Sequence, residues 1–304
     1  MANDTLIKGM LFNESVRMIA ISGKGIVEEA KRIHGLSRVC TAALGRTLMI
    51  TSMMGSMLKN DTEKVSCIVS GGGPAGNIVC TSRSDGAVKG YIEEPALELP
   101  PTTDGKLDVS TAVGWFGKLT VVRDMSLKEP YVGTCAMVSG EIAEDFANYF
   151  TVSEQQPTLL YLGVRIDAES GDVRSAGGIL VQPLPNCPDE YIDVLTAKAS
   201  EISRFAFMLE TSDARSALDE IFDGAELCVT NELSPCFKCD CSRERLEKVL
   251  IALGRDELMD MIKTDGHAEL TCHFCNEKYD FSCDELERLL FACMKNRTED
   301  DDEI

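Results

Sequence analysis

The chain has 304 residues, of which 44% are hydrophobic and 26% charged. This composition excludes a disordered or fibrous protein and indicates a globular one, whose length predicts two units with a linking segment. Lys and Arg total 30 against 50 Asp and Glu, a net charge of −20. Because nucleic acid is held largely by cations that neutralise its phosphates, this charge argues against a nucleic-acid partner.

Cysteine content and apolar stretches indicate the compartment. The N-terminus lacks a basic segment followed by an apolar one, so we expect no secretory signal. Residues 39–58 form the least polar long stretch, but Arg46 interrupts it and small polar residues are scattered through it. It therefore predicts a buried core helix and no membrane partner. Thirteen cysteines indicate a reducing, cytoplasmic location, and their odd number argues against a complete set of internal disulfides.

Residues 1–183 predict an α+β fold, with a mixed α/β core domain. Periodicity predicts helices at 24–34, 36–58 and 142–152 and strands at 5–12, 15–22, 119–123, 159–167 and 177–183, with strand, turn and strand over 64–94. The glycine-rich "GGGPAG" (residues 71–76) in that last segment lacks the Lys-Ser/Thr of a phosphate loop, so we interpret it as a hairpin turn.

A helical linker is expected at 184–232, after the prolines of 183–188. Its amphipathic stretches, 189–209 and 212–222, have no core of their own, so they must pack on something else. We expect the core domain to cover their apolar face, which includes Ile192, Leu195, Ile202, Phe205 and Leu218. After Ser234-Pro235 we expect a small zinc-binding domain at 233–297 and a solvated acidic tail at 298–304.

Four cysteines in two close pairs mark that C-terminal domain: Cys239 with Cys241, and Cys272 with Cys275. Helices are expected near 243–253, 256–263 and 284–295, and a hairpin at 267–281 carries "CHFC" at its tip. Two short-spaced thiol pairs brought together by a fold satisfy the tetrahedral geometry of zinc. The sequence therefore predicts a structural or regulatory zinc site.

Spacing does not decide which four thiols are the ligands. Cys236 and Cys239 also form a Cys-x-x-Cys pair, so Cys236, Cys239, Cys272 and Cys275 are an alternative set. His267 and His273 lie nearby, and we interpret both as exposed polar residues of the hairpin.

No arrangement of residues predicts an enzyme. His34 ends a helix beside Gly35 and suits a helix C-terminus better than catalysis. Trp115, between two glycines, is interpreted as a core or interface aromatic. The sequence contains neither a Ser/His/Asp order nor a His-Glu-x-x-His motif, and we expect no catalytic residue.

The whole chain resembles a known family. "FKCDCSRER" followed by a distant "CHFC" is similar to the zinc-binding end of the bacterial redox-regulated heat-shock holdase, the 33 kDa heat-shock protein family. Segments resembling that family's core domain occur in the same order: "HGLSRVCTAALGRTLM", "GGGPAGNI", "LDVSTAVGWFGKLTVVRD", "GEIAEDFANYFTVSEQQPT" and "AGGILVQPLPN".

The resemblance implies both site and function. It implies one zinc ion on Cys239, Cys241, Cys272 and Cys275 in the reduced form, and disulfides Cys239-Cys241 and Cys272-Cys275 after oxidation. The implied activity is ATP-independent binding of unfolded client proteins, with self-association as a dimer when oxidised. The chain departs from the family in its many cysteines, and Cys236, Cys283 and Cys293 lie close enough in sequence to affect the oxidised pairing.

Two other functions compete with this one. A zinc-ribbon module for nucleic acid is opposed by the charge and by the lack of a basic stripe. A thiol oxidoreductase would place its Cys-x-x-Cys at a helix N-terminus, whereas "CHFC" is expected to cap a hairpin.

Overall fold

A computed structural model describes residues 4–127 and 129–300, with side chains described through Cys293. The chain divides into two compact units, Met1–Lys238 and Cys239–Ile304. The first unit contains two five-stranded antiparallel sheets, and the second contains a two-stranded hairpin with three helices. The expected α+β fold class is confirmed.

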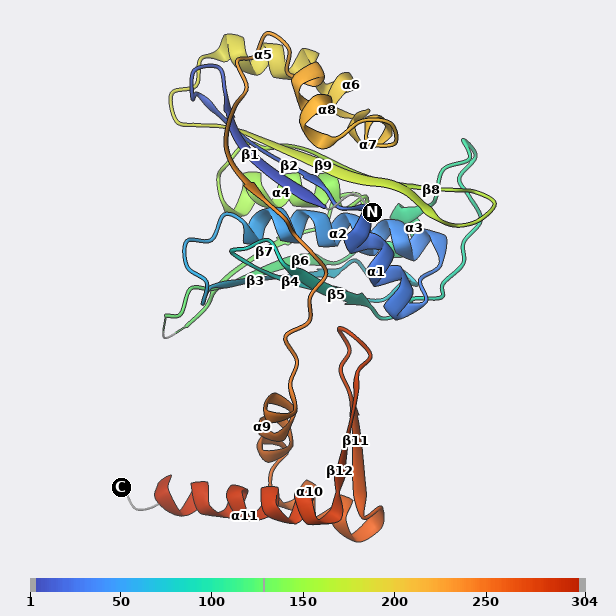
Figure 1. Cartoon of the computed structure of the whole chain (residues 1–304), viewed down its shortest axis with the longest axis vertical. Coiled ribbons are helices and arrows are strands. Elements are labelled where there is room, and N and C mark those ends of the chain that lie inside the picture. The colour runs from blue at the N-terminus through green and yellow to red at the C-terminus, as the bar shows by residue number, and fades with distance from the viewer. Residues whose placement is uncertain (1–3, 128, 301–304) are drawn as a thin grey trace. The chain divides into compact units, whose positions relative to one another are not determined.

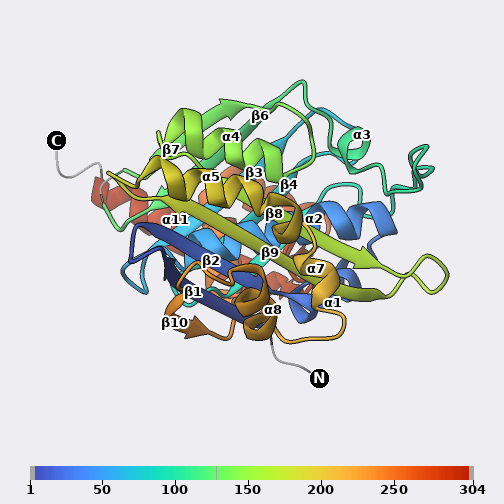
Figure 2. The ribbon, with the colours of Figure 1, turned by 90° about the horizontal axis from the view of Figure 1, so that it is seen from above.

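The first sheet has the order β10-β1-β2-β9-β8 (Figures 1 and 2). Its strands are β1 (Thr5–Leu11), β2 (Val16–Ser22), β8 (Leu159–Ile166), β9 (Val173–Pro183) and β10 (Cys228–Leu233). β1 and β2 form the expected hairpin. β10 was not expected: it pairs with β1 across more than two hundred residues of chain and becomes an edge of the sheet.

The second sheet has the order β5-β4-β3-β6-β7. Its strands are β3 (Lys64–Ser70), β4 (Ile78–Arg83), β5 (Val88–Ile92), β6 (Lys118–Asp124) and β7 (Tyr131–Ala136). The glycine run of residues 71–76 connects β3 to β4, which confirms the hairpin turn. It packs against the end of α3 (Val109–Val113) so closely that a Cβ at Gly71 would lie 2.2 Å from the Gly114 carbonyl oxygen. Neither β7 nor α3 was expected.

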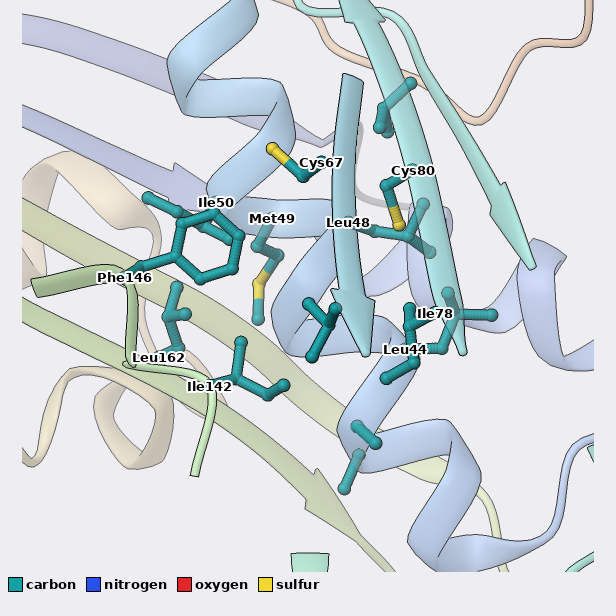
Figure 3. Close-up of a cluster of buried hydrophobic side chains, with 14 of the residues drawn as sticks. Leu44, Leu48, Met49, Ile50, Cys67, Ile78, Cys80, Ile142, Phe146 and Leu162 are labelled. Carbon is teal, nitrogen blue, oxygen red and sulfur yellow. The ribbon is translucent and has the colours of Figure 1, made fainter. Parts of the chain in front are cut away.

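Helix α2 (Arg38–Gly55) lies between the two sheets and is buried on nearly every side. Ser37 caps its start, since the Ser37 hydroxyl accepts a hydrogen bond from the Cys40 backbone N–H. Figure 3 shows Leu44, Leu48 and Met49 of α2 among side chains from both sheets. The expected core helix is confirmed, and no helix among the described residues is long and apolar enough to cross a membrane.

Two more helices complete this core. α1 (Lys24–His34) has the expected bounds and ends at Gly35, which adopts the left-handed conformation that glycine tolerates. His34 stays at this helix end, with its Nε2 atom 3.1 Å from the Gly90 carbonyl oxygen. α4 (Ala143–Ser153) packs on β6, β7 and β8. Trp115 is not a core residue, because 43% of its side chain is exposed on a loop.

The linker residues pack on the outer face of the first sheet (Figures 1 and 2). They form four short helices: α5 (Asp189–Ala197), α6 (Ala199–Ile202), α7 (Phe205–Met208) and α8 (Ala214–Ile221). The first expected stretch is thus broken into three helices. Leu195, Ile202, Phe205 and Leu218 are buried as expected, in a cluster with Ile7, Met18 and Ile179 of the sheet. Ile192 is the exception, with 40% of its side chain exposed.

The second unit has a much smaller core. Its elements are α9 (Arg243–Leu253), α10 (Arg255–Thr264), β11 (His267–Thr271), β12 (Lys278–Ser282) and α11 (Cys283–Asp300). These match the expected helices and hairpin within a few residues, except that α11 runs further. The first three residues of the expected solvated tail are therefore helical, and residues 301–304 lie outside the described residues. Among the described side chains, its apolar cluster buries Leu250, Leu258, Phe281, Leu286 and Cys293.

Candidate metal centre

Four cysteines from two distant segments meet in the second unit. The Sγ atoms of Cys239, Cys241, Cys272 and Cys275 all lie within 4.8 Å of one another. The Cys239 and Cys272 sulfurs are 3.7 Å apart, and those of Cys241 and Cys275 are 3.3 Å apart. The cluster therefore joins each member of one pair to a member of the other.

The turn between β11 and β12 shapes the Cys-x-x-Cys half of the site. The backbone N–H groups of Cys275 and Asn276 both donate to the Cys272 carbonyl oxygen, and Cys272 N–H donates to Glu277. Asn276 has φ 57°, a left-handed conformation that asparagine tolerates better than most residues. This tight turn points both thiols to the same side and confirms the expected hairpin tip.

The Cys-x-Cys half is held by charged neighbours. Ser242 begins α9 and accepts a hydrogen bond from Arg245 N–H, and the Arg245 guanidinium pairs with Asp240 at 2.8 Å. Arg243 lies 4.3 Å above the Phe281 ring and pairs with Glu285 at 2.7 Å. These contacts join the Cys-x-Cys segment to β12 and to α11.

The electrostatics differ between the thiols. Burial opposes ionisation of Cys241, but hydrogen bonds from Tyr279 and from the other cysteines outweigh it and lower its pKa. Burial raises the pKa of Cys275. The Tyr279 hydroxyl lies 3.2 Å from Cys241 Sγ, and that hydrogen bond is the main reason why the pKa of Tyr279 is raised. Cys241 is thus the thiol of this pair that ionises more readily.

The alternative thiol, Cys236, is not in the cluster. It is exposed, and its backbone carbonyl accepts a hydrogen bond from Val88 N–H, while Lys238 N–H donates to the Val88 carbonyl. Residues 236–238 therefore run along β5 of the first unit. His267 and His273 are exposed, as expected, and neither belongs to the cluster.

The four sulfurs fit a tetrahedral metal ion. Metal–sulfur bonds of about 2.3 Å imply sulfur–sulfur separations of about 3.8 Å, and the observed separations of 3.7 Å and 3.3 Å need only a small adjustment. Thiolate-only surroundings select soft or borderline metal ions over hard ones such as magnesium. The geometry and the chemistry of the cluster therefore fit a bound metal ion.

Sequence reasoning overlooked two residues that support this site. Tyr279 and Arg243 had been assigned only to a strand and a helix. The period-two alternation of Tyr279 and Phe281 on β12 was visible, but which side chain reaches the thiols depends on how the Cys-x-Cys segment crosses the hairpin.

Comparison with known proteins finds similar chains over nearly the full length of this one. Residues 4–282 match the family model of the Hsp33 protein. The 33 kDa chaperonin of Clostridioides difficile is 42% identical over 288 residues, covering 94% of this chain and 98% of that protein. The 33 kDa chaperonin of Alkaliphilus metalliredigens is 41% identical over 286 residues, with the same coverage of both chains.

A solved structure agrees with the fold. The crystal structure of the 33 kDa chaperonin of Thermotoga maritima, a heat shock protein 33 homologue, superposes with a TM-score of 0.87. It is 35% identical and covers 97% of this chain and 100% of its own. Family model, relatives and structure each span nearly the whole chain, so the chain belongs to the Hsp33 family of chaperones.

Proposed function

We propose that the protein is a redox-regulated, ATP-independent holdase that binds unfolding proteins under oxidative stress. The observation that carries the proposal is the four-thiol cluster of Cys239, Cys241, Cys272 and Cys275. In the reduced protein, these four thiolates would hold one zinc ion. Zinc keeps all four sulfurs as thiolates, the form that oxidants attack.

The small core of the second unit makes it dependent on the metal. A segment of about 60–70 residues is marginal on its own core, and five buried apolar side chains hold this one. Structural zinc contributes an apparent ~10–16 kcal/mol in small finger peptides, against a stability of ~5–15 kcal/mol for a whole domain. Oxidation of the ligands, which removes the metal, therefore unfolds this region.

The linker, residues 184–232, transmits the change to the client surface. The linker ends within β10, which pairs with β1. Residues 236–238 then lead to Cys239 and are held by two backbone hydrogen bonds with Val88. Release of the linker exposes two apolar faces at once. One is the apolar face of α5–α8, and the other is the outer face of the first sheet, with Ile7, Met18 and Ile179. The core domain, residues 1–183, carries the second of these faces.

We further propose that oxidation pairs sequence neighbours, Cys239 with Cys241 and Cys272 with Cys275, as the family resemblance implies. Peptide mapping after peroxide treatment should find these two bridges. Bridges that join the two pairs, or a main Cys236-Cys239 bridge, would contradict this pairing.

The decisive experiment follows zinc release, thiol loss and suppression of a client's aggregation together during oxidation, without ATP. We expect the three to rise together, the oxidised form to sediment as a dimer, and a reductant to restore free thiols. If the reduced, zinc-loaded protein already suppresses the client's aggregation completely, the proposed redox regulation would be contradicted.

The same preparation tests the two competing functions. Retention on immobilised nucleic acid at physiological salt would favour a zinc-ribbon module. Zinc-independent turnover of a dithiol substrate would favour an oxidoreductase. The geometry does not favour the oxidoreductase, because "CHFC" lies in a hairpin turn and not at a helix N-terminus. The net charge of −20 does not favour the nucleic-acid module.

A further inference from the structure

Tyr279 reaches the thiol cluster from β12 and contacts the Cys-x-Cys half of the site. It lies on β12, directly across from Leu270 on β11, and its ring packs against the small core of the second unit. Its hydroxyl lies 3.2 Å from Cys241 Sγ. Strand pairing and packing of the ring place the hydroxyl beside Cys241 in the folded unit.

We propose that Tyr279 is a positioning residue of the metal centre, which holds Cys241 as a ligand and slows its oxidation. The inference rests on the proposed metal-binding function. The hydroxyl donates its hydrogen to the Cys241 thiolate, a charge-assisted hydrogen bond that is stronger than one between neutral groups. Groups that hydrogen-bond to metal ligands typically change metal affinity 10- to 100-fold when they are removed.

The same hydrogen bond opposes oxidation by a peroxide. The Cys241 sulfur attacks one peroxide oxygen, so an S–O bond forms, the O–O bond breaks and the other oxygen leaves as water after taking a proton. A second thiolate of the site then attacks that sulfur and displaces the hydroxyl, which also leaves as water with a proton from solvent. Two thiolates thus lose two electrons to one peroxide molecule.

The first attack needs a sulfur lone pair, and the Tyr279 hydrogen bond occupies one and draws electron density from the sulfur. The hydroxyl therefore sets how much oxidant the switch requires. This role is separate from the packing of the ring, which phenylalanine preserves.

The test compares Tyr279→Phe with wild type and with Tyr131→Phe, a control in the first unit whose side chain is 45% exposed. Full-length reduced proteins are loaded with zinc or with cobalt(II). In Tyr279→Phe we expect metal affinity, measured by chelator competition, to fall about 10-fold. We also expect faster peroxide-driven zinc release and a sulfur-to-cobalt charge-transfer band at longer wavelength, because the sulfur lone pair is no longer stabilised. Tyr131→Phe should match wild type in all three.

The outcomes separate this inference from the function on which it rests. A wild-type protein with no cobalt–thiolate band would overturn both. A wild type with the band and a Tyr279→Phe variant that matches it in affinity, release rate and band position would overturn the role of Tyr279 alone. Weaker binding with an unshifted band would assign Tyr279 to packing, and would overturn the proposal equally.

Discussion

Cysteines in the two units have opposite chemical environments. Cys67 and Cys80 lie opposite each other on β3 and β4 in the first unit, both fully buried under α2. Burial raises the pKa of Cys67 to about 12 and that of Cys80 well above its usual value. In the second unit, hydrogen bonds from Tyr279 and from the other cysteines lower the pKa of Cys241. Burial therefore disfavours the thiolate of Cys67 and Cys80, whereas the hydrogen bonds of the cluster favour the thiolate of Cys241, the form that binds metal ions.

The two units also differ in the size of their apolar cores. In the first unit, α2 is sandwiched by two sheets, and a second apolar cluster holds the linker helices. In the part of the second unit whose side chains are described, one apolar cluster of five buried side chains lies beside the thiol cluster. Packing alone can hold the first unit, whereas on the proposed function the second unit also needs a metal ion, which oxidation of the thiols would remove.

The largest expected effect is loss of the metal. Cys239→Ser, Cys241→Ser, Cys272→Ser and Cys275→Ser should each lose zinc and unfold the second unit, because the metal's apparent ~10–16 kcal/mol matches or exceeds the stability of a small domain. Metal content and circular dichroism measure this. The matched control is Cys236→Ser, which removes an exposed thiol outside the cluster and should keep its zinc. Full zinc in Cys241→Ser with loss in Cys236→Ser would show that the other quartet is correct.

The next effect concerns the linker. After zinc removal, hydrogen exchange across α5–α8 should accelerate while α2 stays protected, because the cost of ordering the linker is no longer offset by its docking. Binding of a hydrophobic dye should increase at the same time. Unchanged exchange in α5–α8 together with the appearance of holdase activity would place the client site on the core domain alone.

The smallest expected effect distinguishes a buried from an exposed apolar side chain of the linker. Leu218 is fully buried against the first sheet, whereas Ile192 is 40% exposed. Leu218→Ala should weaken linker docking by about 2–5 kcal/mol and Ile192→Ala by about 1 kcal/mol or less. With zinc bound, dye binding on heating should begin at a lower temperature in Leu218→Ala than in Ile192→Ala. Equal onset temperatures would show that docking does not depend on this apolar cluster.

Strands with strong alternation were predictable, and strands without it were not. β1, β2 and the β11–β12 hairpin follow from patterns that each segment carries by itself. β10, with the sequence CVTNEL, is largely exposed. Its sequence therefore lacks the alternation of apolar and polar residues that marks a half-buried strand. It is a strand because β1 offers a free edge, and a partner so distant in the chain cannot be found from local periodicity.

The sequence alone was enough to predict most of the helices and strands, though not β7, β10 or α3, and to reveal two thiol pairs with metal-ligand spacing. Local periodicity and short spacings can be read from the sequence because they involve only residues that are close together along the chain. Only the tertiary structure decided that Cys236 lies outside the cluster, that the linker packs on the first sheet, and that Tyr279 reaches Cys241. Each of these depends on where distant backbone segments cross, because a hydrogen bond or a metal ligand is selected by distances of a few ångströms.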